Sequence, residues 1–136
     1  MSALRYLLDT NICIYIAKQR PPSVAARFAK LAAGSVGMSL ITYGELRYGA
    51  EKSSQRGSTL DKLERLQSII PVISPDAVVG ERYGAIRAHL ERAGTPIGNN
   101  DLWIAAHALS LGVTLISNNT REFERVPKLK LDNWVE

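Results

Sequence analysis

The chain has 136 residues, 46% of them hydrophobic and 22% charged, so length and composition predict one globular domain covering residues 1–136. No apolar stretch approaches the roughly 18 residues that span a bilayer, and the opening lacks a signal-peptide cleavage site, so we expect a cytoplasmic protein without membrane contact. Seventeen basic and 13 acidic residues give a net charge of +4, which only weakly favours a polyanionic partner because the basic residues are scattered.

The first predicted element is a strand over residues 4–8 that stops at an acid, Asp9. Its apolar run is typical of a strand buried on both faces of a parallel sheet. Thr10 and Asn11 offer a hydroxyl and an amide that could start the helix predicted over residues 12–18. Asp9 then stands at the carboxyl end of a strand, where ligands bind in open α/β sheets, although capping of the following helix explains this residue equally well.

The next predicted elements continue the alternation of helix and strand. In chain order they are a helix from Ser23 to Gly34, a strand over residues 36–41, an αα-hairpin over residues 42–68 and a strand over residues 70–73. Ser23 is expected to cap the first of these helices, behind two prolines. Thr42 and Glu45 have the spacing of a capping box, which gives Glu45 a purely structural explanation.

The second half of the chain repeats the pattern. It is predicted to contain a helix from Pro75 to Gly94, a loop over residues 95–99, a helix opened by Asn100 and Asp101, a strand over residues 113–116, a polar connection over residues 117–125 and an edge strand over residues 129–134. Ser74 is expected to cap the first helix. Strands alternating with helices predict an α/β fold, with a central parallel sheet of about four to five strands sandwiched between helices.

Three acids occupy similar places in this pattern. Asp9 follows the first strand, Glu45 comes shortly after the second, and Asp101 opens the helix that leads into the fourth. Each acid alone is explained equally well by capping or by the helix dipole. Several carboxylates at one sheet edge would repel one another and raise their pKa values unless a cation lies between them. Their convergence therefore predicts a metal site.

The remaining metal-binding residue types do not form a cluster. Cys13 lies among isoleucines and is predicted to be a small core residue. His107 and His89 are predicted to be structural or exposed. A site with oxygen ligands only is suited to a hard cation, so Mg²⁺ or Mn²⁺ is the expected cofactor.

Four sequence blocks, taken in order, resemble those of PIN-domain ribonucleases. They are Leu8-Asp9-Thr10-Asn11, Ser39-x-x-Thr42-x-x-Glu45-Leu46-x-x-Gly49, Ile97-Gly98-x-x-Asp101-x-x-Ile104-Ala105-Ala106-His107-Ala108, and Ser117-Asn118-Asn119-x-x-Glu122-Phe123. More narrowly, the chain is similar to the VapC toxins of type II toxin-antitoxin modules. The resemblance runs from end to end and closes with Leu131-x-x-Trp134.

The resemblance implies a Mg²⁺- or Mn²⁺-dependent endoribonuclease with a PIN-like fold. It implies that Asp9 and Asp101 bind the metal and that Glu45 helps to bind it or orients its water. Asn119 stands where many PIN domains carry a fourth acid, and we expect its amide to orient water. Glu122 is the nearest carboxylate that could replace the missing acid.

The resemblance also implies partners. They are an RNA substrate, expected to be a structured RNA such as tRNA, a small VapB-type antitoxin that holds the toxin inactive, and a second copy of the chain in a homodimer. Arg47 and Arg121 are the candidate RNA-binding residues, although an ordinary exposed helix charge is the favoured explanation for either one alone. Two alternatives stay open: a catalytically weak RNA-binding or protein-interaction module whose acids only cap helices, and cleavage of DNA by the same site.

Overall fold

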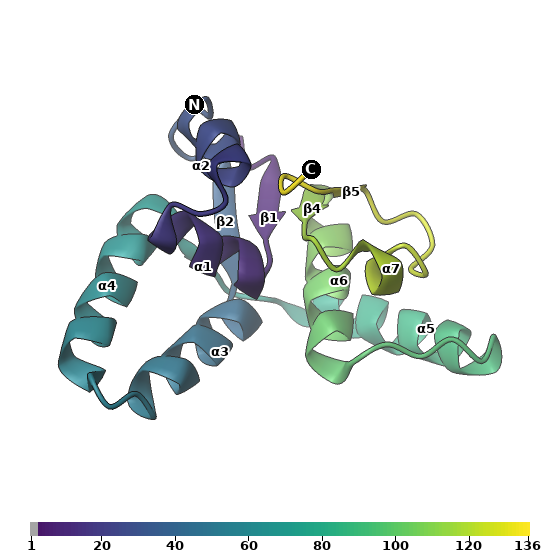
Figure 1. Cartoon of the computed structure of the whole chain (residues 1–136). Coiled ribbons are helices and arrows are strands. Elements are labelled where there is room, and N and C mark those ends of the chain that lie inside the picture. Colours follow the sequence, from purple (N-terminus) through teal and green to yellow (C-terminus); the bar gives the residue numbers. More distant parts are fainter. Residues whose placement is uncertain (1–2) are drawn as a thin grey trace.

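A parallel sheet forms the centre of the protein. The structure is a computed structural model that describes residues 3–136, and within that range five strands pair in the order β3-β2-β1-β4-β5, all parallel (Figure 1). The strands are β1 Tyr6–Leu8, β2 Val36–Ser39, β3 Val72–Ile73, β4 Thr114–Ile116 and β5 Leu131–Asp132. The predicted α/β class and strand number are confirmed.

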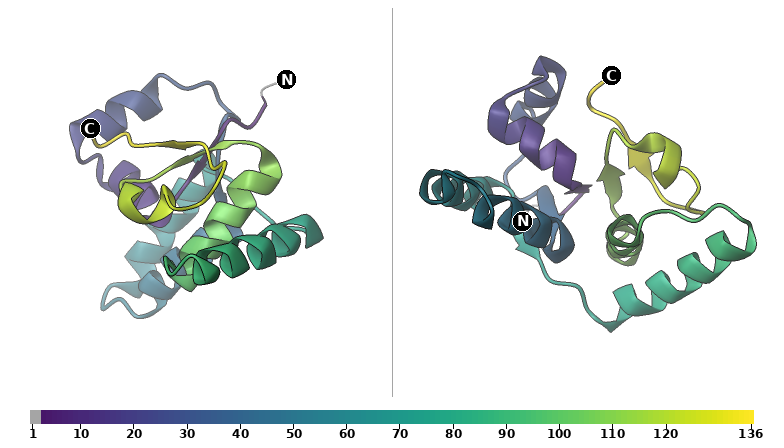
Figure 2. Two further views of the ribbon diagram at one scale, coloured as in Figure 1. Left: turned by 90° about the vertical axis from the view of Figure 1, so that its right-hand side faces the viewer. Right: turned by 60° about the horizontal axis from the view of Figure 1, so that its bottom comes forward.

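Helices cover both faces of this sheet, as Figure 2 shows in two further views. Along residues 3–136 they are α1 Thr10–Lys18, α2 Pro22–Ala29, α3 Leu40–Glu51, α4 Arg56–Ile69, α5 Ala77–Arg92, α6 Asn99–Leu111 and α7 Thr120–Phe123. α3 and α4 form the predicted αα-hairpin, and α5 packs along α6. None of the helices in the described part of the chain is long and apolar enough to cross a membrane.

Alternate residues of the two central strands build two separate cores. Leu7 and Leu115 point to the face that α5 and α6 cover, whereas Leu8 and Ile116 point to the face that α1, α2 and α4 cover. All four side chains are fully buried, because side chains alternate along a strand and both faces of this parallel sheet are covered. Cys13 is a buried member of the second core, as predicted.

The boundary between β2 and α3 differs from the prediction. The strand ends at Ser39, whose hydroxyl accepts a hydrogen bond from the Ile41 amide at 3.2 Å and so caps α3. The predicted capping box of Thr42 and Glu45 is therefore wrong. Thr42 lies inside the first turn, fully buried, and its hydroxyl has no hydrogen-bond partner. A short apolar run does not distinguish a buried strand from the first turn of a buried helix, which explains the error.

Three other helix starts also differ from the predictions. α1 begins at Thr10 and is capped by Asp9, which is one of the two explanations that the sequence leaves open for this residue, and α5 is capped by Asp76 rather than by Ser74. α2 begins directly at Pro22, so Ser23 lies inside the helix and its hydroxyl instead donates to the Val135 carbonyl at 3.0 Å. For α2 and α5 a neighbouring residue with a suitable side chain or a fixed φ angle replaces the predicted cap.

Candidate active site

Asp9 lies where β1 ends, at the carboxyl edge of the sheet. Its backbone amide donates to the Ile116 carbonyl of β4 at 3.1 Å, which continues the pairing of β1 with β4. One carboxylate oxygen accepts a hydrogen bond from the Ile12 amide at 3.0 Å, and the residue is only 6% exposed. Asp9 therefore caps α1 and also places a buried carboxylate at the sheet edge, so its role as a cap does not exclude a role in a ligand site.

Glu45 lies in the second turn of α3 and caps nothing. Its carboxylate accepts a hydrogen bond from the Thr10 hydroxyl of α1 and another, at 3.4 Å, from the Asn100 amide of α6. The side chain thus connects three helices at one point. Sequence reasoning did not assign Thr10 or Asn100 to the site, although each directly adjoins one of the predicted acids, Asp9 and Asp101.

Asp101 is the third residue of α6, in the first turn, where a carboxylate also complements the helix dipole. The backbone of the preceding Gly98 passes close to it, because a Cβ built on Gly98 would lie 3.8 Å from the Asp101 Oδ2 atom. The side chain is half-buried. The structure therefore places Asp101 at the same edge as Asp9, with a helix N-terminus behind it.

Asn119 and Glu122 reach this edge from the segment that follows β4. The Asn119 amide donates to the Ser117 hydroxyl at 2.9 Å, which turns the chain back toward the sheet, and α7 begins at the next residue. The Asn119 side-chain amide lies 3.4 Å from the Asp101 Oδ2 atom and 3.2 Å from the Glu122 Oε2 atom. Asn119 therefore bridges two carboxylates, and Glu122 belongs to the acidic group.

The pKa values show that these acids interact. Burial raises the pKa of Asp9, hydrogen bonds from Ser117 and the Ile12 amide oppose this, and the charge of Glu45 raises it further. The pKa of Asp101 rises to about 7, chiefly through burial and then through a hydrogen bond with Glu122 and the charges of Glu122, Asp9 and Glu45. No ion pair within residues 3–136 involves any of these four acids.

The donor atoms at this edge are of the chemical type that a divalent cation uses. They are carboxylate, amide and hydroxyl oxygens, which suit Mg²⁺ and Mn²⁺. Among the described residues, no three Asp, Glu, His or Cys side chains are arranged so that they could hold one ion together. Mg²⁺ is commonly bound through one or two carboxylates, with waters and substrate phosphates completing its shell, so a site of this kind does not need three protein ligands.

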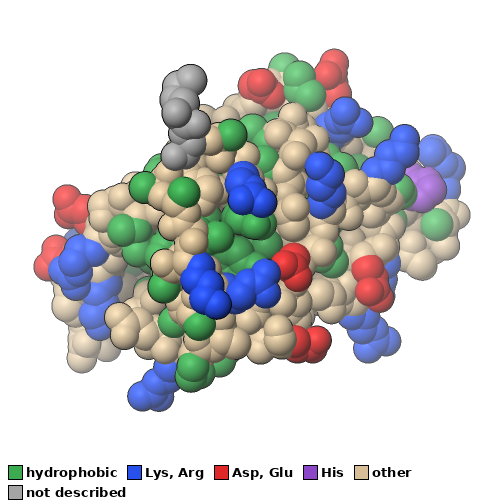
Figure 3. Space-filling model, turned by 90° about the horizontal axis from the view of Figure 1, so that it is seen from above, with side chains coloured by type: hydrophobic (Ala, Val, Ile, Leu, Met, Phe, Trp, Pro, Cys, Tyr) green, Lys and Arg blue, Asp and Glu red, His purple; other side chains and the backbone are tan. Residues whose placement is uncertain are grey.

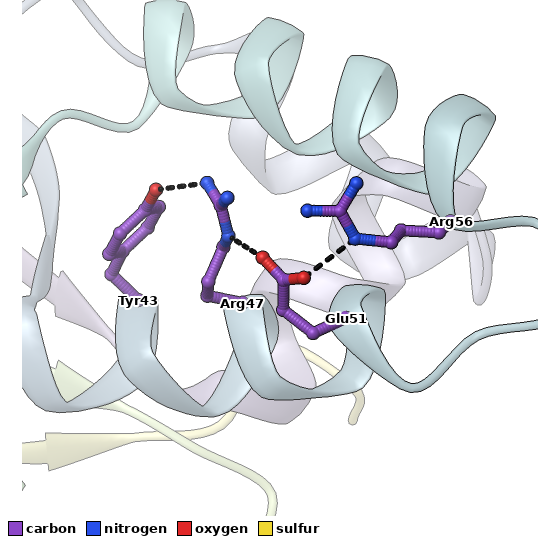
Figure 4. A network of polar contacts seen from close by, with 4 residues as sticks. All are labelled: Tyr43, Arg47, Glu51 and Arg56. Atoms are coloured by element: carbon purple, nitrogen blue, oxygen red, sulfur yellow. Dashed lines mark hydrogen bonds and ion pairs between the residues drawn. The ribbon is translucent and has the colours of Figure 1, made fainter.

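The two predicted RNA-binding arginines lie in different surroundings. Arg47 points toward α4 but is bound by residues of its own helix, α3 (Figure 4). Its Nε atom donates to Glu51 at 2.7 Å, and its Nη1 atom donates to the Tyr43 hydroxyl at 3.5 Å. Arg56 donates to the same Glu51 carboxylate at 2.6 Å. The structure therefore engages Arg47 in the α3–α4 hairpin rather than at the acids. Arg121 is exposed on α7, one residue before Glu122.

The histidines have the surroundings expected of non-catalytic residues. His107 is buried between α6 and α3, its Nδ1 atom lies 2.8 Å from the Ser39 hydroxyl, and burial lowers its pKa. His89 is exposed on α5. His107 thus joins α6 to the N-terminus of α3, the two helices that carry Asp101 and Glu45.

An open parallel sheet with an acidic group at the ends of its central strands defines the class of protein. The family model of the PIN domain matches residues 6–129, and the chain belongs to this family. It is 46% identical over 131 residues to the tRNA(fMet)-specific endonuclease VapC of Shigella flexneri, covering 96% of this chain and 98% of that protein. It is 45% identical over 132 residues to Ribonuclease VapC2 of Haemophilus influenzae, covering 97% and 99%. The expected resemblance to VapC toxins is confirmed.

Solved structures agree with this assignment. The structure of VapBC-1 from nontypeable Haemophilus influenzae matches with a TM-score of 0.90 and 41% identity, over 98% of this chain and 100% of that one. The DNA-bound VapBC structure from Salmonella typhimurium matches with a TM-score of 0.90 and 41% identity, over 96% and 98%. The PIN-like architecture is therefore shared along nearly the whole chain.

Proposed function

We propose that this chain is the toxin of a toxin-antitoxin pair and a divalent-metal-dependent endoribonuclease. One observation carries the proposal: in a protein of net charge +4, four carboxylates meet at one sheet edge, and no ion pair of the described residues neutralises them. Helix capping accounts for Asp9, but it does not account for Glu45, which lies in the second turn of its helix. Shared negative charge without a basic partner is what a cation site requires.

In this proposal Asp9 and Asp101 hold Mg²⁺ or Mn²⁺. When bound, such an ion lowers the pKa of a water molecule and acts as a Lewis acid on a phosphodiester. Glu45 is fixed by Thr10 and Asn100, so its carboxylate is preorganised to accept a hydrogen bond from the attacking water.

Asn119 and Glu122 complete the group on the other side of Asp101. The Asn119 side-chain oxygen offers an acceptor to water without adding charge, while its NH₂ group is engaged with Asp101 and Glu122. Glu122 acts as an auxiliary carboxylate whose position depends on Asn119. Attack by water rather than by the 2′-hydroxyl predicts products with 3′-hydroxyl and 5′-phosphate ends.

The proposed substrate is a structured cellular RNA, with tRNA the first to be tested. Support comes from the name of the Shigella flexneri relative, which specifies tRNA(fMet), and from the extent of the match. The proposed inhibitor is a VapB-type antitoxin, supported by the VapBC structures that the chain resembles. We further propose that the chain works as a homodimer in the cytoplasm.

The test is a cleavage assay with purified protein, total tRNA and initiator tRNA, and Mg²⁺ or Mn²⁺. We expect metal-dependent cuts whose 5′ ends, mapped by sequencing, carry phosphate, and no cleavage by the Asp9→Asn variant. A single-stranded DNA of the same sequence tests the open alternative of DNA cleavage. Cleavage that persists undiminished in chelator, or in Asp9→Asn, would refute the proposed site.

A melting experiment separates this proposal from a catalytically weak module. A cation that binds only the folded chain stabilises it by RT ln(1 + [L]/Kd), about 2.7 kcal/mol at a hundredfold excess over Kd. We therefore expect the Tm to rise with Mn²⁺ concentration, and this rise to be lost in Asp101→Asn. Acids that merely cap helices would leave the Tm unchanged in both proteins.

A further inference from the structure

A small hollow lies between α5 and the start of α6. Its volume is about 240 Å³. The floor is apolar and tightly packed, because Leu90, Ile97 and Leu102 are 2%, 8% and 4% exposed. The rim is formed by Arg87, Glu91, Pro96 and Asn99. Pockets for drug-sized ligands are typically larger, roughly 300–1,000 Å³, so this hollow can take only a small group.

The hollow and the acidic site share one short segment of chain. Ile97 and Asn99 line the hollow, and the residue between them, Gly98, passes close to the Asp101 carboxylate. Figure 2 shows this segment returning from the far end of α5 to the N-terminal end of α6. The hollow and the acidic group therefore meet at the backbone of residues 97–99, which separates the two.

Hydrogen bonds hold the side chains of the rim in place. The Arg87 Nε atom donates to Glu91 at 2.9 Å, and its Nη1 atom donates to the Tyr83 hydroxyl at 2.9 Å. That hydroxyl in turn donates to the Asn99 side-chain oxygen. Tyr83 is stacked on Trp103 with the ring centroids 3.8 Å apart. These contacts hold a guanidinium, a carboxylate and an amide around an apolar floor.

These groups match the chemistry of a nucleobase. An unpaired base has an apolar flat body and an edge that carries both donors and acceptors, and sequence-specific RNA recognition uses such bases. Arg87 supplies donors, Glu91 an acceptor, and Asn99 both. A further guanidinium, that of Arg125, donates to the Pro96 carbonyl at 2.9 Å and so adds positive charge for flanking phosphates beside the rim.

We propose that this hollow is a base-binding subsite, which takes one unpaired nucleobase of the RNA next to the phosphate that is cut. The inference rests on the proposed function and deepens it, because it assigns substrate selection to Arg87, Glu91 and Asn99. Binding in the hollow fixes the register of the RNA relative to the acids.

The direct test does not use cleavage. The four nucleoside 5′-monophosphates are titrated separately into isotope-labelled protein in metal-free buffer, with ribose 5-phosphate as the control for phosphate binding alone. We expect the amide signals of Leu90, Ile97 and Leu102 to shift with at least one nucleotide and not with ribose 5-phosphate. No shift with any nucleotide, or an equal shift with ribose 5-phosphate, would overturn the subsite.

Matched variants locate the effect. Arg87→Gln and Glu91→Gln change exposed side chains on the rim and should weaken nucleotide binding about tenfold, the scale of one lost base contact. Arg82→Gln and Glu81→Gln make the same charge changes on the same helix outside the hollow and should bind like wild type. Equal behaviour of all four variants would contradict the proposal.

Cleavage of an RNA pool with randomised sequence gives the second readout. Wild type should show a base preference at one position beside the cut, and Arg87→Gln and Glu91→Gln should lose or change it. An unchanged preference in both variants would overturn the subsite even if cleavage is intact. If wild type cuts no RNA, the proposed function fails, and the nucleotide titration still decides the subsite. In a parallel titration with a peptide, shifts of the Leu90, Ile97 and Leu102 amide signals that no nucleotide produces would identify a protein-binding surface. That result would refute the base-binding role.

Discussion

The double role of Asp9 can be separated by comparing two substitutions. Its carboxylate accepts the Ile12 amide at 3.0 Å as the cap of α1, and its charge is buried among other acids. Asp9→Asn keeps an oxygen acceptor for the Ile12 amide and removes the charge. Asp9→Ala removes both. In metal-free buffer we expect Asp9→Asn to be at least as stable as wild type, because repulsion and burial of a charge are relieved.

The cost of the second substitution follows from the lost cap. Replacing a capping Asp by Ala lowers the free energy of unfolding by about 1 kcal/mol. For a chain of this size that corresponds to a fall in Tm of roughly 3–5 °C relative to Asp9→Asn. Both variants should lose RNA cleavage. Unfolding in urea, followed by circular dichroism without metal, measures the stabilities, and the tRNA assay measures activity.

Asp76 provides the matched control. It caps α5 through the Val78 amide at 3.1 Å, but it is exposed and is not one of the four acids of the site. Asp76→Asn should be nearly neutral, Asp76→Ala should lose about 1 kcal/mol, and both should keep cleavage. A clear destabilisation by Asp9→Asn without metal would refute the repulsion argument. Equal stability of Asp9→Asn and Asp9→Ala would refute the capping argument.

Other substitutions test the remaining contacts. Asn119→Asp places a third carboxylate beside Asp101 and Glu122, so we expect tighter Mn²⁺ binding by titration and lower stability without metal. Glu122→Gln should reduce cleavage less than Asp9→Asn does, and an equally deep loss would show that Glu122 is not auxiliary. Burial lowers the pKa of His107, so its proton binds more readily to the unfolded chain and stability is lost as the pH falls below about 6.5. His107→Gln should therefore lose less stability than wild type between pH 7 and pH 5 in urea unfolding. Copurification from the native host should yield a second, shorter chain, and recovery of only free, active toxin would count against the antitoxin.

The sequence was sufficient to predict the alternation of strands and helices and the edge to which the acids belong. Short, mainly apolar runs such as residues 4–8 are informative because a strand in a parallel sheet is buried on both faces. Helix starts were less predictable. Ser39 and Thr42 are both good caps, and only the point at which β2 loses its partner β3 decides between them.

The site could be predicted in part for a related reason. Asp9, Glu45 and Asp101 stand beside recognisable element boundaries, whereas the contacts of Thr10 and Asn100 with Glu45 join positions 35 and 55 residues apart. Such pairs depend on how helices pack, which the local pattern does not contain. Arg47 differs, because its partner Glu51 lies four residues further along the same helix, a spacing that is visible in the sequence.

The distribution of positive charge on the surface limits what net charge alone can say about the position of the site. Figure 3 shows Lys and Arg side chains around apolar surface on the face seen from above, at the end of the sheet opposite the acids. Net charge therefore did not locate the site. The acidic group stands out because it lacks basic partners, and that property is visible only once the chain is folded.

The central position of β1 has a consequence for synthesis of the protein. β1 pairs with β2 on one side and with β4 on the other, so the strand that carries Asp9 is enclosed only after Thr114 to Ile116 has been made. At roughly 5–20 residues per second, a ribosome needs on the order of ten seconds to extend the chain from Asp9 to Glu122. Until then the nascent chain has no complete acidic group, so the proposed cleavage of RNA cannot begin before synthesis is nearly finished.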